Sequence, residues 1–219
     1  MGYIQLAPIG DPITGTPSMM IGASTNLMVN KEGVRFVNET ERRDVIAGAE
    51  LEQTDGQMWL ISDSRNVGLR EDGTNNYGVS VQSAMDAGIC FMADTLGELA
   101  EKIGVDPEVL AATVEEFNQC VKNGADPAFG RAVYEDNSDI LEGPFYAFLN
   151  SPAVHHTMGG IEIDVDTHVI GTDGQIIPGL YAAGEVTGGI HGGNRLGANA
   201  IADALTFGRI AGKTSASSK

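Results

Sequence analysis

The sequence predicts an α+β fold, in which a larger part of mixed helices and short strands precedes a C-terminal strand, glycine-rich turn and helix. Three observations predict it. Short apolar runs at 58–63 and 145–149 are typical of buried strands. Residues 94–124 read as a helix pair with clear start and stop signals. Near the end, a glycine-rich turn separates an apolar strand at 179–183 from a helix that begins around 197–199.

The first quarter of the chain is predicted to hold short strands and turns. Residues 3–6 read as a strand, and residues 7–17, which contain three prolines and two glycines, read as a loop. Two apolar segments at 26–30 and 34–37 flank a glycine turn and predict a hairpin. A helix is expected to follow over 45–51.

The helix pair is predicted from caps and spacing. Gly104 ends the first helix, Asp106 caps the second with Pro107 in its first position, and Gly124 ends it. Apolar residues at helical spacing form the two packing faces: Leu96, Leu99, Ala100 and Ile103, then Leu110, Val114, Phe117 and Val121.

Pro152 marks a boundary, so we expect domains at 1–152 and 153–219. In the second domain, short β segments at 161–164 and 176–178 lead into the glycine-rich turn. The polar tail after Gly212 is expected to be disordered.

Composition restricts the function. The formal net charge is −17, from 30 acidic and 13 basic residues, which argues against nucleic-acid binding. A carboxylate ligand would therefore need a locally basic site, for which Arg43 and Arg195 are the candidates. The chain has no apolar run long enough for a transmembrane helix, so no membrane span is expected. Cys90 and Cys120 are read as buried thiols in a reducing compartment.

The glycine-rich turn carries Glu185, His191, Asn194 and Arg195 just before a helix N-terminus. Backbone N–H groups at such a turn approach an anion or the polar edge of a ring, and an arginine offers a charged fork to a carboxylate. The alternative is that Arg195 only pairs with a local acid. Further polar clusters at 42–44 and 154–160 favour a binding site.

The segments HHTMGG, GLYAAGEVTGG and HGGNRLGANA follow one another between His155 and Ala200. In these motifs the chain resembles the C-terminal part of the FAD-dependent fumarate reductase family, the flavocytochrome c type that includes urocanate reductases. The resemblance covers almost the whole chain. It implies that residues 1–152 form a capping, or clamp, domain and that 153–219 form the returning C-terminal segment of the FAD-binding α/β domain.

The resemblance implies FAD-dependent reduction of the C=C bond of a small unsaturated carboxylate, by hydride from flavin N5 and a proton from an arginine. Arg43, shortly after a Val-Asn-Glu segment and before Asp44, matches the proton donor. His155 and Arg195 match the residues that bind the substrate carboxylate, and Ser18 keeps a hydroxyl contact. The family's flavin-lining positions fall on His156, Thr157, Gly184, Glu185, Asn194, Ala198, Asn199, Ala200 and Ile201.

Some family features are absent or changed. No GxGxxG fingerprint follows a strand, so the N-terminal flavin segment, or an electron donor, is expected outside this chain. The His-Pro-Thr of the family's fumarate reductases is replaced by Ala7-Pro8-Ile9. Met19 and Gly22 fall where the family has a proton-relay glutamate and arginine. A monocarboxylate, urocanate-like or aryl-acrylate-like, therefore fits better than fumarate.

Several alternatives stay open from the sequence. The chain could be a truncated remnant that folds without holding flavin, or part of a related succinate-type flavoprotein dehydrogenase or oxidase. Arg43 could merely pair with Glu41 or Asp44 on the surface. The adjacent histidines lack a third ligand at useful spacing, so no metal is expected. The compartment, bacterial cytoplasm or cell envelope, is left open.

Overall fold

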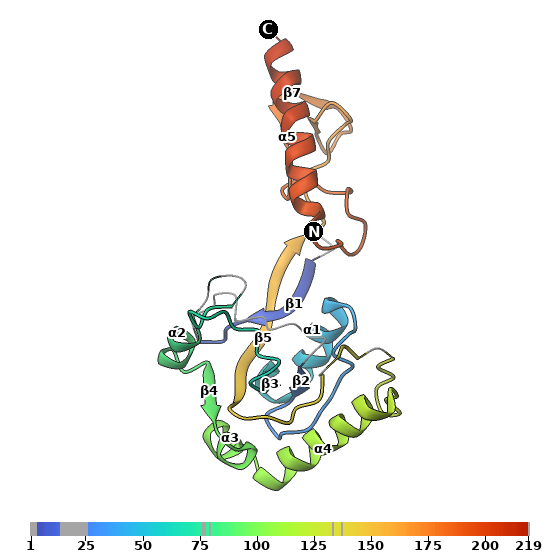
Figure 1. The fold of residues 1–219 in the computed structure, drawn as a ribbon. Coiled ribbons are helices and arrows are strands. Elements are labelled where there is room, and N and C mark those ends of the chain that lie inside the picture. Colours follow the sequence, from blue (N-terminus) through green and yellow to red (C-terminus); the bar gives the residue numbers. More distant parts are fainter. Residues whose placement is uncertain are drawn as a thin grey trace. The chain divides into compact units, whose positions relative to one another are not determined.

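The computed structural model describes residues 4–13, 26–75, 78, 80–132, 134–136 and 138–218 (Figure 1). The chain forms two compact units: a large unit, Ala7–Ala153, and a small unit, Met1–Leu6 with Val154–Lys219. Strands β1 (Ile4–Gly10) and β5 (Phe145–Thr157) run from one unit into the other. The sequence placed a boundary near residue 152 but did not group residues 1–6 with the C-terminal part. The roles of capping domain and flavin-domain segment stay predictions.

The large unit is built on a five-stranded sheet with the order β1-β5-β3-β2, to which β4 (Cys90–Ala93) adds by pairing with β5. Strands β2 (Leu27–Val29) and β3 (Met58–Ser62) pair antiparallel, as do β3 with β5 and β4 with β5. All side chains of β2 and β3 are buried, which explains their continuous apolar runs. The α+β prediction is confirmed.

The predicted loop at 7–17 was wrong over its first residues, because β1 continues through Pro8 to Gly10. A proline lacks the N–H that a central strand needs, but β1 lies at the edge of the sheet, where this donor is dispensable. The predicted hairpin was also only partly right. A single bridge joins Val29 to Arg35, and β2 pairs with β3 instead.

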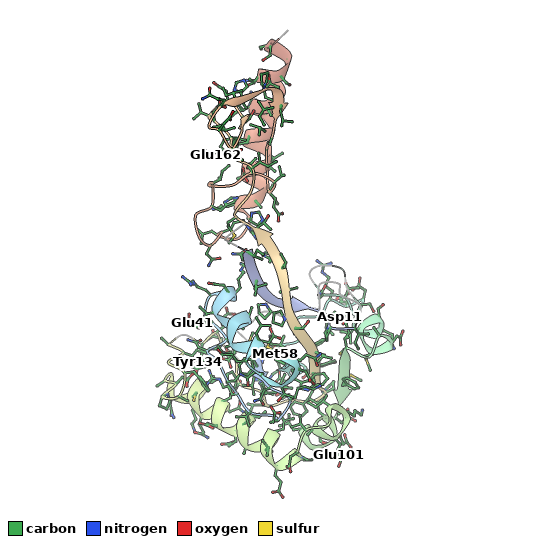
Figure 2. The ribbon with its side chains drawn as sticks, turned by 180° about the vertical axis from the view of Figure 1, so that it is seen from behind. Asp11, Glu41, Met58, Glu101, Tyr134 and Glu162 are labelled. Carbon is green, nitrogen blue, oxygen red and sulfur yellow. The ribbon has the colours of Figure 1, made fainter. Side chains whose placement is uncertain are left out.

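The helix pair is confirmed as α3 (Leu96–Ile103) and α4 (Pro107–Asn123). The Asp106 carboxylate accepts hydrogen bonds from two backbone N–H groups at the start of α4, and Gly104 and Gly124 end the helices in the left-handed conformation. The two helices pack against each other and lie together in Figure 1. Figure 2 shows Met58 among the packed side chains of the interior, whereas Glu101 projects from α3.

The described part of the large unit also contains α1 (Arg43–Leu51), η2 (Thr54–Gly56) and α2 (Val81–Asp86). The sequence predicted α1 from residue 45, two residues late, and missed α2 and β4. Both missed elements are too short for their apolar spacing to stand out.

A buried ionic network holds the segment that leads into α1. The Glu39 carboxylate accepts hydrogen bonds from Arg35 at 2.7 Å and from Arg131 at 2.9 Å, and Arg35 also pairs with Asp126 at 2.7 Å. Burial alone would lower the pKa of Arg35, but its bonds to Glu39 and Asp126 outweigh that effect and raise it. Each buried charge of this network is paired with an opposite charge, which offsets the free-energy cost of removing it from water.

The small unit contains the hairpin of β6 (His168–Ile170) and β7 (Ile176–Tyr181), beside helix α5 (Asn199–Ser217) in Figure 1. The predicted disordered tail was wrong, because α5 continues to Ser217. Gly212 weakens a helix by about 1 kcal/mol but does not end it, and no proline follows. In the described ranges, every helix is too short or too polar to span a lipid bilayer.

Glu50 is a contrasting case in the large unit. Its side chain on α1 is fully buried, and neither carboxylate oxygen has a hydrogen-bond partner among the described residues. Burial raises the pKa of Glu50 from 4.5 to about 8. The folded chain therefore keeps a proton on Glu50 at neutral pH, whereas the unfolded chain releases it.

Glu50 should make the large unit less stable as pH rises. Below pH 4.5 both states hold the proton, so Glu50 adds no pH dependence. As pH rises from 4.5 to about 8, the free energy of unfolding should fall by about 1.4 kcal/mol per pH unit and then level off. Urea unfolding followed by fluorescence of Trp59, the single tryptophan, measures this in the large unit.

Glu50→Gln should remove that contribution, so the difference in stability between wild type and variant should grow with pH. Glu52→Gln, at an exposed position just after α1, is the matched control and should change little. Parallel pH curves for wild type and Glu50→Gln would contradict the prediction.

Candidate functional site

The site in the small unit begins where β5 ends. After Thr157 the backbone of 158–161 meets the turn at 184–189: Ile161 N–H donates to the Val186 carbonyl at 2.8 Å, Gly188 N–H donates to the Ile161 carbonyl at 3.0 Å, and Gly189 N–H donates to the Met158 carbonyl at 3.4 Å. Ile161 and Thr187 form a parallel bridge. The HHTMGG and GEVTGG segments, far apart in sequence, are therefore joined by backbone hydrogen bonds.

Two glycines make this junction possible. A Cβ on Gly160 would collide with the Val186 carbonyl oxygen, and a Cβ on Gly188 would lie 2.7 Å from the Gly160 nitrogen. Neither contact involves a flexible side chain that could move away. These glycines are needed for close approach of two backbones, which the sequence did not reveal.

Glu185 lies in the turn of this junction, and its side chain contacts the end of β5. Its carboxylate accepts a hydrogen bond from the Thr157 backbone N–H at 3.0 Å and lies 3.4 Å from His156 Nδ1. The side chain of Glu185 is half exposed, whereas His156 is buried. Burial lowers the pKa of His156, and Glu185 only partly offsets this, so the imidazole is neutral at pH 7.

A second acid lies on α5. His191 Nε2 lies 3.1 Å from the carboxylate of Asp203, the one buried residue of α5 among those the structure describes. The His191 ring meets the His156 ring edge to face, with centroids 5.2 Å apart. These contacts tie the turn that carries Arg195 to both α5 and β5.

Arg195 is buried with several partners. Its Nη1 donates to the Leu196 carbonyl at 3.1 Å, and its Nη2 lies 3.3 Å from Gln5 Oε1 and 3.0 Å from His155 Nδ1. Gln5 also donates to the Arg195 carbonyl at 2.8 Å and to the Asn194 side chain. We call Gln5, His155, Asn194 and Arg195 the carboxamide junction.

Some buried polar atoms near these groups still lack a protein partner in the part of the chain that the structure describes. They are His156 Nε2, Arg195 Nε and Asp203 Oδ1. Buried polar groups are normally paired, so these atoms mark places where a polar ligand or water would be satisfied. The adjoining start of α5 is exposed, and Ala198 there adopts the left-handed conformation with φ +66°. These features fit one side of a cofactor cradle.

The structure gathers most of the predicted site residues in the small unit. His155, His156, Thr157, Gly184, Glu185, Asn194 and Arg195 lie around the junctions described, and Ala198, Asn199, Ala200 and Ile201 form the start of α5. Arg43 is the first residue of α1 in the large unit, so its proximity to Arg195 stays a prediction. Ser18, like Met19 and Gly22, lies outside the described residues.

Sequence reasoning missed Gln5 and Asp203, and it noted His191 without a role. A signal existed for two of them: Gln5 is a polar residue inside an apolar strand, and Asp203 is an acid within the apolar run Ile-Ala-Asp-Ala-Leu. In the described ranges, no three His, Cys, Asp or Glu side chains gather as a metal site would require.

The family model described as FAD binding domain matches residues 5–201, which include every residue of the carboxamide junction and the start of α5. This chain belongs to the FAD-binding-domain family. The prediction of FAD as cofactor is thereby confirmed.

The relatives are reductases of unsaturated acids. The NADH:acrylate oxidoreductase of Vibrio harveyi is 44% identical over 216 residues, covering 98% of this chain and 21% of that protein. The urocanate reductase of Eggerthella lenta is 40% identical over 227 residues, covering 99% of this chain and 36% of that protein. The motif-based resemblance to this group is confirmed.

A solved structure extends the comparison to the fold. The open conformation of a flavocytochrome c3 fumarate reductase matches with a TM-score of 0.75 and 36% identity, covering 99% of this chain and 37% of that one. The chain thus spans between about a fifth and two fifths of the length of the proteins it matches.

The glycine junction gives a testable prediction. Gly160→Ala should destabilise the small unit by about 1–3 kcal/mol, because the new Cβ meets fixed backbone. All four histidines lie in the small unit, so their imidazole NMR signals followed on heating report its unfolding, while Trp59 fluorescence reports the large unit. The Trp59 transition should not move.

Gly208→Ala is the matched control. Gly208 lies inside α5, and a Cβ there would meet no atom within 4 Å, so this variant should gain about 0.5–1 kcal/mol. Equal effects of the two substitutions would contradict the role given to Gly160.

Proposed function

We propose that this chain is the substrate-binding and proton-donating part of an FAD-dependent reductase of α,β-unsaturated carboxylates. One observation carries the proposal: Arg195, a buried guanidinium whose Nε–H lacks a partner among the described residues, lies directly against His155. An arginine and an imidazole side by side provide donors for one carboxylate group. The named relatives act on acrylate and urocanate, which each carry such a group.

In this proposal each residue of the chain has a defined task. His155 and Arg195 hold the carboxylate and stabilise the negative charge that develops as the double bond is reduced. When bound, reduced FAD supplies the hydride that adds to one alkene carbon. Arg43 gives the proton to the other carbon, so the C=C bond becomes a CH–CH bond. His156, Thr157, Glu185 and the start of α5 line the cofactor.

The position of Arg43 supports its proposed role. It is half-buried in the first turn of α1. Its neighbour Arg42 pairs with Asp44 at 3.0 Å and is exposed. Arg43 is thus the less exposed of the two adjacent arginines, as a side chain that contacts a substrate requires.

We further propose that a flavin-binding segment outside these 219 residues completes the cradle, and that an electron donor serves it. Helix α5 buries Asp203 alone among its described residues, while Leu196, Ile201 and Leu205 are each at least 67% exposed. Apolar groups gathered in this way favour coverage by another protein segment.

The proton-donor role predicts a strong effect of Arg43→Ala on turnover. In the full-length enzyme assayed with reduced viologen, this variant should lose roughly 10²–10⁴-fold in kcat, because a positioned acid contributes about that much. Arg42→Ala is the matched control, since it removes the adjacent exposed arginine, and should stay near wild type. Comparable losses in both variants would contradict the role of Arg43.

Substrate preference is a separate prediction. Ala7 and Ile9 are buried in β1 and have no side-chain donor, so a second carboxylate gains nothing from these positions. We expect monocarboxylates such as urocanate or aryl-acrylates to be reduced with higher kcat/KM than fumarate. Faster turnover of fumarate than of every monocarboxylate tested would refute this preference.

A further inference from the structure

Gln5 is a buried carboxamide, 1% exposed, to which the proposed function assigns no task. It lies on β1, in the part of that strand that belongs to the small unit. It contacts all three other members of the carboxamide junction. A single amide thus joins the end of β5 to the turn that carries Arg195.

Both ends of the Gln5 amide have matching partners. Nε2 donates to the Asn194 side-chain oxygen and to the Arg195 carbonyl, which accept hydrogen bonds. Oε1 faces Nη2 of Arg195, which donates. The reverse orientation would set oxygen against oxygen at one end and N–H against N–H at the other, so the orientation of the amide is determined by its surroundings.

The same contacts determine where His155 carries its proton. Arg195 Nη2 lies 3.0 Å from His155 Nδ1, and a guanidinium can only donate. Nδ1 therefore holds a lone pair, and the ring proton lies on Nε2. Gln5 Oε1 lies 3.2 Å from Nδ1 and is also an acceptor, so neither atom can donate to the other. Oε1 and Nδ1 each accept a hydrogen bond from an N–H of Arg195 Nη2.

We propose that Gln5 is the positioning residue of this site: it holds Arg195 against His155, so that the imidazole is neutral and presents its Nε2–H as a donor for the substrate. This deepens the proposed function, on which only the substrate part of the inference rests. The junction then offers one positive charge, on Arg195, and one neutral donor, on His155. That balance matches a single carboxylate and gives a physical reason for preferring a monocarboxylate.

The proposal is tested by the ring proton of His155. The chain is labelled with ¹⁵N-histidine, and two-bond ¹H–¹⁵N spectra distinguish the Nε2–H from the Nδ1–H form. The four histidines give few signals, and His155→Gln identifies those of residue 155. Wild type should show the Nε2–H form. Gln5→Leu, which frees Arg195, should show a mixture of both forms.

Gln5→Glu provides the second, isosteric variant. It puts a second oxygen where Gln5 Nε2 donates to the Asn194 side chain and the Arg195 carbonyl, so these contacts are lost and a mixture of both proton forms of His155 should appear. Gln175→Leu, at an exposed turn of the small unit, is the matched control and should leave the spectrum of His155 unchanged. The signals of His168, on β6, show whether each variant is folded. If His155 keeps the Nε2–H form in both Gln5 variants, the proposal is overturned.

Kinetics of the full-length enzyme separate this inference from the proposed function. Gln5→Leu should raise KM for a monocarboxylate by at least tenfold with a smaller change in kcat. A changed tautomer with unchanged KM for every carboxylate would support the positioning role and refute carboxylate binding by His155 and Arg195. An unchanged tautomer refutes the positioning role, whatever the kinetics.

Discussion

The close contact between Gly160 and Gly188 is the constraint on which the small unit depends. It lets two backbone segments exchange hydrogen bonds directly, with no side chains between them. Once these segments are joined, Glu185 reaches Thr157 and His156. The same turn, fixed at its start, continues to Arg195 and α5. The steric requirement at these two glycines therefore underlies the contacts of Glu185 with the end of β5.

Buried ionisable side chains lie in three kinds of surroundings in the described part of the chain. In the large unit, Arg35 and Arg131 are paired with Glu39 and Asp126, so desolvation is offset by ion pairs. In the small unit, Arg195 is held by neutral acceptors and keeps one N–H unpartnered among the described residues. Glu50 avoids the cost by keeping its proton. Of these three arrangements, that at Arg195 leaves a buried cation with an N–H that no described residue accepts and that could bind an anion.

Much of the fold and of the site was predictable from local patterns. The caps at Asp106, Gly104 and Gly124 act within one turn, so the helix pair could be read from sequence. The motif residues from His155 to Ile201 were identified together because they lie in a few short segments. Gln5 was missed because its partners are about 150 and 190 residues away. The strand through Pro8 was missed because only sheet order makes a proline acceptable there.

The sequence by itself determined the fold class, the family, the cofactor and the identity of the motif residues, since each depends on residue types at short spacing. Tertiary structure decided which of these side chains touch and in what protonation form. Hydrogen-bond donors and acceptors are matched only when distant segments meet, as Gln5, His155 and Arg195 do. Which ring nitrogen of a histidine carries the proton depends on such contacts between distant segments and not on the histidine alone.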